Sequence, residues 1–368
     1  MSAEPRIPHS RPSRVSGDLE ALARVLESGH LDAGPEVRAL EAEAALSCGR
    51  RWAVATTSGQ TALHLALLIL EAGPGDRVAL PSYVCSALLN AVRYVGAVEV
   101  LADAAPGSFN LDPEAQALRV ARVIVVPHLL GFPAPLGPIL QRARARGARV
   151  VEDCAMAAGA VVEGRPAGAA GDLAVFSLYA TKMISCGQGG LLAGDDPRLE
   201  ERARDLIAYD NRDAYRVRYN YGLTDIQGAL ARLQWRALPR FVQRRRALAE
   251  RYSRSIDFSL AARLGERGSP PADPPEPESR SCFFRYPVDL GAAAVRDRVR
   301  TALARQGIET NPPVHRPIHR YLGLPDGDFP QASRLQDGVL SIPIYPDLQD
   351  GEADRVAEAL NQAMRSGS

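Results

Sequence analysis

The sequence predicts an α/β protein with a mostly parallel central sheet, flanking helices and a smaller C-terminal α+β domain. From residue 52 onward, short apolar segments of strand length alternate with segments of helical periodicity, a pattern typical of a parallel sheet covered by helices. Near residue 224 the alternation stops, and long Arg-rich helical segments follow. The length of 368 residues fits two compact domains, or one large α/β unit with an appendage.

The first half of the chain carries the elements of the predicted sheet. It opens with two amphipathic helices, expected at 18–28 and 36–47, which a turn containing Gly29 and Pro35 separates. The predicted strands are 52–56, 77–80, 98–101, 120–127, 149–152, 173–178 and 190–192. The helices expected between them are 61–71, 84–95 and 136–146.

The second half predicts a smaller unit. Its expected elements are helices at 225–238 and 240–260, a Pro-rich irregular loop at 264–280, a strand at 283–288 and helices at 292–306 and 350–364. The predicted organisation is an N-terminal arm at 1–17, a large α/β domain at 18–238 and a small α+β domain at 239–368.

Composition excludes several classes of protein. The net charge of +1 is too small to indicate a nucleic acid or an anionic membrane as partner, and no apolar run approaches the roughly 20 residues of a membrane span. The segment 1–17 has no apolar core, so we do not expect a signal peptide. Five scattered cysteines without a CxxC pair argue against a disulfide scaffold or a metal site and favour the cytoplasm.

One basic residue differs from all the others. Of the 44 basic residues 43 are Arg, and the remaining one is Lys182. A surface lysine would lose little on replacement by Arg, whereas an amine that must lose its proton to act as a nucleophile cannot be replaced. Chance survival is the alternative, but the count favours a functional role for Lys182.

Polar residues follow predicted strands at several points. Ser58, Gly59 and Gln60 lie where the first strand leads into a helix, and the free N–H groups at a helix start bind phosphate. An ordinary serine N-cap explains the same residues equally well. Asp153 follows a strand and therefore lies at the sheet edge where ligands bind in open α/β proteins. A helix cap or a surface ion pair is an equal alternative for this carboxylate.

The strand 173–178 has a hydroxyl, Ser177, near its end, and Lys182 follows five residues later. The serine could hold a phosphate, and burial near a cation would lower the pKa of the lysine and free its lone pair for a Schiff base. Gly187–Gly190, the run that follows, allows tight turns and close backbone approach. An anion-binding helix start, a strand-end carboxylate, this serine and the lone lysine occur in the order that a site for pyridoxal 5'-phosphate requires.

These residues bring out a resemblance that covers nearly the whole chain. The sequence resembles the DegT–DnrJ–StrS family of pyridoxal-phosphate-dependent aminotransferases, best known for aminating nucleotide-linked keto sugars. The matching segments are 6–8, 28–35, 58–63, 81–83, 109–113, 127–131, 152–155, 171–182, 219–221, 224–227 and 340–346.

The resemblance implies the aspartate-aminotransferase fold (fold type I) and a homodimer with shared active sites. It implies that Lys182 is the Schiff-base lysine and proton carrier and that Asp153 pairs with the pyridine nitrogen. Ser177 and the amides of Gly59 and Gln60 would hold the phosphate, with Asn220 reaching it from the neighbouring subunit. His128 matches a position near the cofactor, although a structural histidine with satisfied hydrogen bonds is as good an interpretation.

The sequence departs from the family pattern at five positions. Cys85 replaces an aromatic residue that stacks on the cofactor ring, and Met156 replaces a glutamine near the cofactor's phenolic oxygen. Gln60 stands where Thr is common. Gln188 stands where Glu is common and Gly222 where Arg is often found, so two charges are lost near the expected substrate. The loss of these charges argues against the standard nucleotide-sugar substrate but not against the cofactor.

The resulting prediction is an aminotransferase that moves an amino group from an amino acid, expected to be L-glutamate, to a keto group of a sugar or a specialised-metabolite intermediate. One alternative is a related pyridoxal-phosphate enzyme that catalyses elimination, cyclisation or C–N bond formation. The family's sugar dehydratases carry histidine in place of the lysine, so the presence of Lys182 argues against that variant. A second alternative is a non-catalytic regulator with the same fold.

Overall fold

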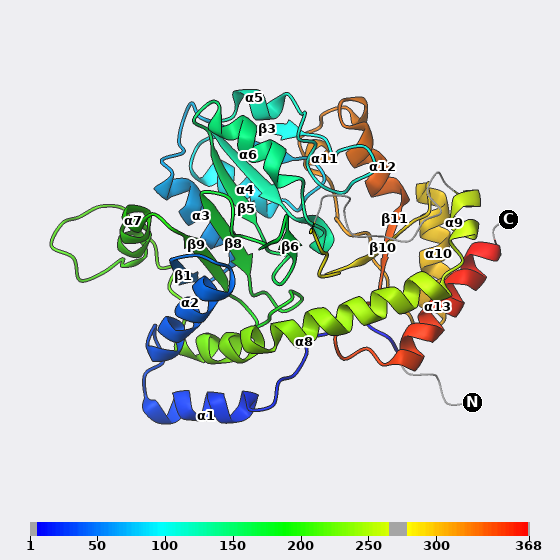
Figure 1. Cartoon of the computed structure of the whole chain (residues 1–368), viewed down its shortest axis with the longest axis horizontal. Coiled ribbons are helices and arrows are strands. Elements are labelled where there is room, and N and C mark those ends of the chain that lie inside the picture. Colours follow the sequence, from blue (N-terminus) through cyan, green and yellow to red (C-terminus); the bar gives the residue numbers. More distant parts are fainter. Residues whose placement is uncertain (1–5, 265–277, 367–368) are drawn as a thin grey trace.

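The computed structural model describes residues 6–264 and 278–366 and is built around a seven-stranded sheet (Figure 1). The strand order is β1-β9-β8-β5-β4-β2-β3, and all neighbours from β8 to β3 are parallel, whereas β9 is antiparallel to both β1 and β8. The strands are β1 (Trp52–Thr56), β2 (Arg77–Pro81), β3 (Val98–Ala102), β4 (Val123–Pro127), β5 (Arg149–Asp153), β8 (Leu173–Ser177) and β9 (Gly190–Gly194). The predicted mostly parallel sheet is confirmed.

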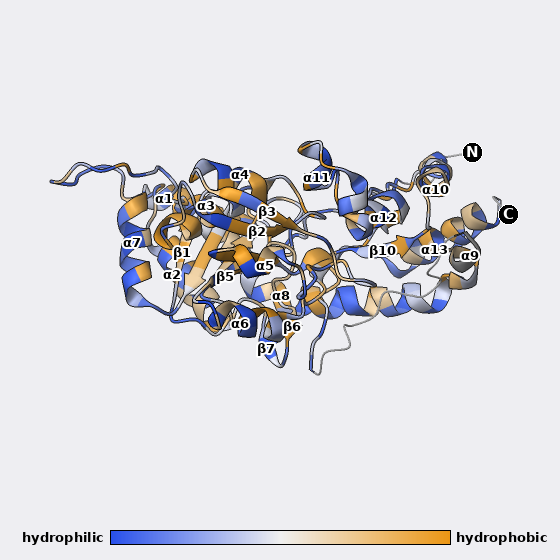
Figure 2. Ribbon diagram, turned by 90° about the horizontal axis from the view of Figure 1, so that it is seen from above, coloured by the Kyte–Doolittle hydropathy of each residue, from blue (hydrophilic) through white to orange (hydrophobic). Residues whose placement is uncertain are grey.

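Alternation along the strands places two apolar layers on opposite faces of this sheet. Val123 and Val125 of β4 belong to one core cluster, and Ile124 and Val126 belong to the other, as expected when successive side chains point to opposite faces. The first face is covered by α3 (Gly59–Ile69) and α4 (Ala87–Tyr94), and the second by α2 (Pro35–Ser47), α6 (Leu136–Arg144) and the first half of α8 (Asp225–Ser255). In Figure 2 the strands are hydrophobic, while hydrophilic residues lie mainly on the outer sides of the helices.

Helix α8 corrects the expectation of two separate helices. It runs without interruption through Pro239, although proline removes one helical hydrogen bond. Its 31 residues span roughly 46 Å at 1.5 Å per residue. Leu238, Phe241 and Val242 are buried on either side of the proline, so packing holds the helix together. The predicted domain boundary between residues 238 and 239 falls inside α8, and the division into two domains stays a prediction.

The C-terminal part pairs α8 with a two-stranded antiparallel sheet and several helices (Figure 1). Its elements are α9 (Phe258–Leu264), β10 (Tyr286–Asp289), α10 (Ala293–Arg305), α11 (Ile318–Tyr321), α12 (Pro330–Gly338), β11 (Val339–Ile342) and α13 (Asp350–Arg365). The expected strand at 283–288 begins late because Phe283 has a φ of 49°, which breaks the extended conformation. Most of the expected Pro-rich loop, residues 265–277, lies outside the described residues.

Helix α1 (Asp18–Ser28) was expected from the sequence. Several further elements have no clear signal in the sequence and were not expected: α5 (Ala117–Val120), β6 (Val161–Val162), β7 (Arg165–Pro166), α7 (Pro197–Ile207) and the 3₁₀ turns Leu129–Gly131 and Asp326–Asp328. Most of the latter span only two to four residues, too few for a periodicity to appear.

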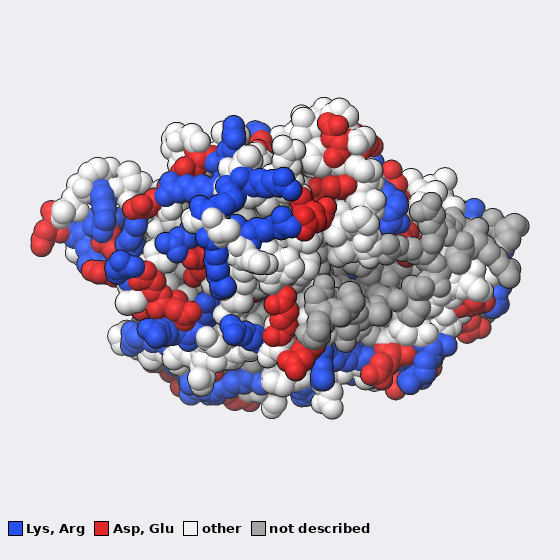
Figure 3. Space-filling view, turned by 45° about the horizontal axis from the view of Figure 1, so that its top comes forward, with Lys and Arg blue, Asp and Glu red and all other residues white. Residues whose placement is uncertain are grey.

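Acidic and basic side chains are interspersed on the face drawn in Figure 3, in keeping with the small net charge. Of the helices in the described part of the chain, none combines the length and the apolar composition that a membrane crossing requires.

The N-terminal arm is tied to the C-terminal part from residue 6 onward. Ile7 forms a parallel bridge with Ile308, and its N–H donates to the carbonyl of Gly307 at 2.9 Å. The ring nitrogen Nε2 of His9 lies 3.0 Å from Ser341 Oγ. Burial, with the positive charge of Arg285, lowers the pKa of His9 to about 3, so His9 is neutral in the folded protein at pH 7.

One buried carboxylate joins the start of α8 to the start of α2. Oδ1 of Asp225 accepts hydrogen bonds from the N–H groups of Gly34 at 2.8 Å and Val37 at 2.9 Å, and Oδ2 accepts one from Glu36 at 3.3 Å. These N–H groups belong to the first turn of α2, which has no capping side chain of its own. A negative charge at this helix end is favourable.

We expect Asp225→Ala to lower the free energy of unfolding by about 2 kcal/mol, because buried N–H groups of α2 lose their acceptor. Urea denaturation monitored by circular dichroism measures this change. Glu27→Ala, which removes an exposed carboxylate on α1, is the control and should change stability by less than about 0.5 kcal/mol. Equal stabilities for the two variants would contradict the capping role.

His9 should make the protein less stable in acid. In the unfolded chain a histidine binds a proton near pH 6.5, whereas folded His9 stays neutral down to about pH 3. The unfolded state therefore binds more protons in this window, and stability falls as the pH decreases through it. We expect His9→Gln to reduce the loss of stability between pH 7 and pH 4 by up to about 3 kcal/mol.

Urea denaturation at each pH measures this difference, with His30→Gln, an exposed histidine substitution, as the control. Parallel pH profiles of the wild type and His9→Gln would show that His9 does not contribute.

Candidate active site

The candidate site lies at the carboxyl edge of the sheet, where β5 and β8 run parallel side by side. Asp153 is the last residue of β5 and Ser177 the last of β8, and the ladder pairs Asp153 with Val175. The chain then makes a short turn, in which the N–H of Lys182 donates to the carbonyl of Tyr179 at 2.8 Å. The carboxyl ends of parallel strands meet at one edge, so the predicted residues are brought together there.

The start of α3 packs directly on Ser177. A Cβ atom added to Gly59 would lie 2.8 Å from Ser177 Cβ and 3.2 Å from its Oγ, so only glycine allows this approach. A Cβ at Gly190 would lie 2.3 Å from the carbonyl oxygen of Ser58, which requires a second glycine. The Ser58 hydroxyl itself caps α3 by accepting from Thr61 N–H at 3.1 Å. A helix start and a serine hydroxyl therefore form one small cradle of the kind that binds phosphate.

Lys182, Asp153 and Cys85 are close enough to influence one another's protonation. Burial lowers the pKa of Lys182, and the neighbouring Cys85 and Asp153 offset part of this effect. Burial raises the pKa of Asp153, with a partial offset from the Ala155 N–H, which donates to Oδ1 at 2.9 Å, and from Lys182. Among the described residues no donor reaches the other oxygen of Asp153, so it can accept a hydrogen bond from a ligand.

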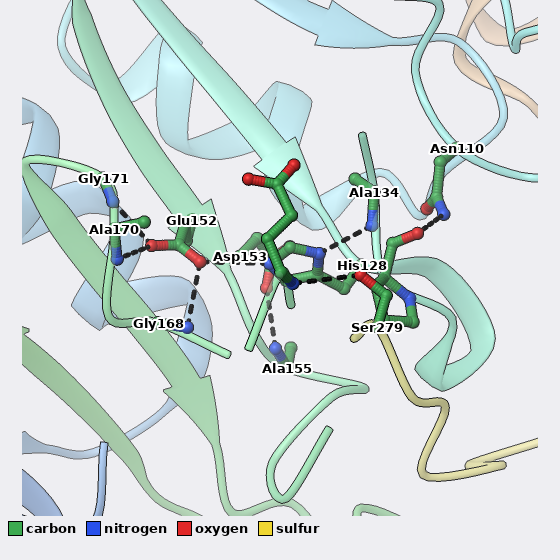
Figure 4. Close-up of polar contacts among 12 residues, drawn as sticks. Asn110, His128, Ala134, Glu152, Asp153, Ala155, Gly168, Ala170, Gly171 and Ser279 are labelled. Atoms are coloured by element: carbon green, nitrogen blue, oxygen red, sulfur yellow. Dashed lines mark hydrogen bonds and ion pairs between the residues drawn. The ribbon is translucent and has the colours of Figure 1, made fainter. Parts of the chain in front are cut away.

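The neighbouring carboxylate, Glu152, has a structural role on the opposite side of β5. It is fully buried, and its oxygens accept hydrogen bonds from the N–H groups of Gly168, Ala170 and Gly171 at 2.9, 2.7 and 2.6 Å (Figure 4). Its charge is balanced by Arg50, whose Nη2 lies 3.6 Å away. Burial raises the pKa of Glu152, but hydrogen bonding to His128 and to the loop N–H groups leaves the pKa below its ordinary value.

His128 belongs to this network, which answers the question that the sequence left open. Its Nδ1 accepts from the Ala134 N–H at 2.9 Å, so Nε2 carries the proton and donates to Glu152 Oε2 at 3.2 Å (Figure 4). Both ring nitrogens are used and the side chain is fully buried. The structure favours the interpretation of His128 as a structural histidine.

The remaining predicted residues lie at different distances from this centre. Cys85 is exposed just after β2, and Met156 is partly buried against both apolar clusters. The Gln60 amide donates to Tyr94 Oη at 3.1 Å. Asn220 is exposed near the end of the segment 208–222, and its side chain makes no hydrogen bond with other described residues. The roles assigned to these residues stay predictions.

Gln188 and Gly222, the two positions where a charge expected near the substrate is missing, have free space around them. Gln188 is exposed, and its carbonyl accepts from the Gln227 amide at 3.1 Å. A Cβ at Gly222 would meet no atom of the described residues within 4 Å, so their packing does not require glycine there.

Sequence reasoning missed two residues beside Lys182. The Nζ atom lies 5.4 Å from the centre of the Phe284 ring, and the guanidinium carbon of Arg285 lies 4.4 Å from the same centre. In the sequence both residues appear as part of a strand, and the only signal was a charged residue in a mostly apolar segment.

Comparison with known proteins agrees with this geometry. Residues 13–361 match the DegT/DnrJ/EryC1/StrS aminotransferase family. The chain is 33% identical to GDP-perosamine synthase of Caulobacter vibrioides over 379 residues, covering 99% of this chain and 100% of the relative. It is 34% identical to the structure of DesV from S. venezuelae, with a TM-score of 0.86 over 95% of this chain and 94% of DesV.

A further structure supports the fold alone. The putative sugar aminotransferase Spr1654 from Streptococcus pneumoniae, in its PMP form, has a TM-score of 0.89 at 24% identity and covers 98% of both chains. The family match, the relatives and the strand-edge site agree: the chain belongs to the DegT/DnrJ/EryC1/StrS aminotransferase family and is an enzyme of the transferase class.

Proposed function

We propose that this aminotransferase uses pyridoxal 5'-phosphate, held at Lys182, to move an amino group from L-glutamate to a sugar keto group. The observation that carries the proposal is the position of Lys182. The chain's only lysine lies beside Asp153, where burial lowers the pKa of its amine. A lowered pKa favours the unprotonated amine, whose lone pair a bond to an aldehyde carbon requires.

The residues at the sheet edge fit the parts of this cofactor. The cradle of Ser177 and the N–H groups of Gly59 and Gln60 would hold the phosphate, and the free oxygen of Asp153 would accept the pyridinium N–H. When bound, pyridoxal phosphate supplies an electron sink for the electron pair left at the donor carbon. Cys85 cannot stack as an aromatic ring does, and Met156 offers the cofactor at most a weak acceptor.

Asp153 and Lys182 would then have separate roles in proton transfer. Asp153 keeps the pyridine nitrogen protonated by holding a negative charge next to it. Lys182 Nζ, whose pKa is lowered by burial, would take the proton from the donor carbon and, in the second half of the reaction, would give a proton to the acceptor carbon.

Relatives support a sugar as the acceptor. One relative is named a GDP-perosamine synthase, and another structure is titled DesI in the presence of its TDP-sugar product, at 29% identity. The open, uncharged positions Gln188 and Gly222 favour an acceptor whose charged part is recognised differently from that of the standard nucleotide sugar. The acceptor could equally be another keto intermediate of specialised metabolism.

We further propose a homodimer in the cytoplasm. The segment 208–222 projects from the body at the left of Figure 1, and it exposes Tyr209, Tyr215 and Val217 at 59%, 95% and 63% of their surfaces. Covering this apolar surface with a second copy would bring Asn220 to the partner's cradle. The five cysteines are free thiols, which suits a reducing compartment.

Lys182→Ala should abolish the chemistry without unfolding the protein. With pyridoxal phosphate, the wild type should form a visible absorption band that L-glutamate converts to the pyridoxamine form. The variant should show no such conversion, a loss of at least about 1,000-fold in rate. Borohydride reduction and peptide mass spectrometry should find the cofactor on Lys182, the chain's only lysine.

Turnover of glutamate by Lys182→Ala would refute the assignment. A band that forms in the wild type but responds to no amino donor would point instead to elimination, cyclisation or C–N bond formation.

Asp153→Asn should keep the fold and slow the reaction with L-glutamate by about 100-fold or more, because a neutral amide cannot hold the pyridine nitrogen protonated. Single-turnover absorbance measurements give this rate. Asp328→Asn, the same change at an exposed position, is the control. An unchanged rate in Asp153→Asn would remove Asp153 from the mechanism.

A further inference from the structure

Three basic side chains surround the ring of Phe284. Lys182 Nζ lies 5.4 Å from the ring centre, and the guanidinium carbons of Arg285 and Arg245 lie 4.4 and 6.0 Å from it. Cations are attracted to an aromatic face, but they repel one another. The edge of the site beside Lys182 is therefore strongly electropositive.

Neither arginine is neutralised within the described part of the chain. Arg245 is 3% exposed, and among the described residues it donates only to the backbone carbonyls of Phe283, Phe284 and Ile344, at 3.3, 3.2 and 2.7 Å. The Arg285 side chain forms no hydrogen bond and no ion pair with any described residue, although it is half-buried. Burial and the charge of Arg245 lower the pKa of Arg285 to about 9.

Other arginines of the chain do have acidic partners. Arg320, for example, pairs with Asp326 at 2.9 Å and with Asp337 at 3.0 Å. A guanidinium removed from water without an anion is unfavourable, because neutral partners replace the lost hydration only in part. A carboxylate, which matches the two-pronged geometry of the guanidinium, would supply the missing partner.

The backbone fixes Arg285 in this place. Its N–H donates to the carbonyl of Leu130 at 3.1 Å, and the Cys282 N–H donates to the carbonyl of Gly131 at 3.0 Å. Gly131 has a φ of 91°, and a Cβ there would lie 2.7 Å from the Phe284 nitrogen. The segment before β10 is thus pressed against the loop after β4, with Phe284 facing Lys182.

We propose that Arg285 binds the α-carboxylate of the amino donor, an inference that rests on the proposed function. The amine of the donor must reach the position of Lys182 Nζ, and its carboxylate is bonded to the same carbon. The anion therefore arrives beside the ring that Lys182 and Arg285 share. The phosphates of a sugar nucleotide are separated from the keto carbon by part of the sugar ring, which makes them the poorer match. Arg245, which lies farther from the Phe284 ring than Arg285, adds a second positive charge near this carboxylate.

The test compares Arg285→Gln and Arg285→Lys with the wild type, all loaded with pyridoxal phosphate. The apparent dissociation constant of L-glutamate is read from the absorbance change in rapid mixing. We expect an increase of about 10- to 100-fold for Arg285→Gln, since a charge-assisted pair is lost. Arg285→Lys keeps the positive charge but loses the bidentate geometry of the guanidinium, so it should give a smaller increase in the dissociation constant.

Two controls separate this effect from damage to the fold. Arg254→Gln makes the same change at an exposed position of α8 and should behave as the wild type. 4-Aminobutyrate, which lacks an α-carboxylate, should react equally with the wild type and Arg285→Gln. The visible band formed with pyridoxal phosphate should also be the same in both proteins.

Each failure has its own signature. An unchanged glutamate constant in Arg285→Gln, with a responsive wild type, would overturn this inference alone. Weaker binding of GDP by calorimetry, with unchanged glutamate binding, would assign Arg285 to phosphate instead and likewise overturn it. A wild type that forms the band and ignores L-glutamate would overturn the proposed function and this inference with it.

Discussion

The site depends on the burial of one carboxylate. Glu152 has no contact with solvent, and it persists as an anion because three loop N–H groups, His128 and Arg50 surround it. An unpaired charge in this place would be far too unfavourable to bury. The same contacts tie β4, β5 and the loop before β8 together, so the strand ends that carry the site are held in a fixed relation.

Alternation along β5 then gives two adjacent carboxylates opposite environments. Glu152 faces the hydrogen-bonding loop, and its pKa lies below the ordinary value. Asp153 faces the sheet edge, where burial raises its pKa and one oxygen stays free among the described residues. One residue is committed to the fold, while the next is available to a ligand. The parallel ends of β5 and β8 and the start of α3 form the rest of the site, and the helices that cover the sheet keep these elements in place.

Local patterns in the sequence predicted most of this, because strands and helix starts depend on neighbouring residues. The sheet, helix α1 and the family resemblance are confirmed. Long-range packing explains the errors: Pro239 stays helical because Leu238 and Phe241 are buried around it, and Arg285 reaches Lys182 only through the Gly131 contact. His128 could not be assigned from sequence, since its partners Glu152 and Ala134 are defined only by the fold. The individual site roles and the domain boundary stay predictions.

Cys85 has a consequence for the durability of the enzyme. It is the exposed one of five thiols and stands next to the amine on which the proposed chemistry depends. Oxidation proceeds through the thiolate, and the surroundings of Cys85 raise the pKa of its thiol, so little thiolate is present at neutral pH. The raised pKa therefore makes Cys85 less reactive towards peroxides than an exposed cysteine with an ordinary pKa would be.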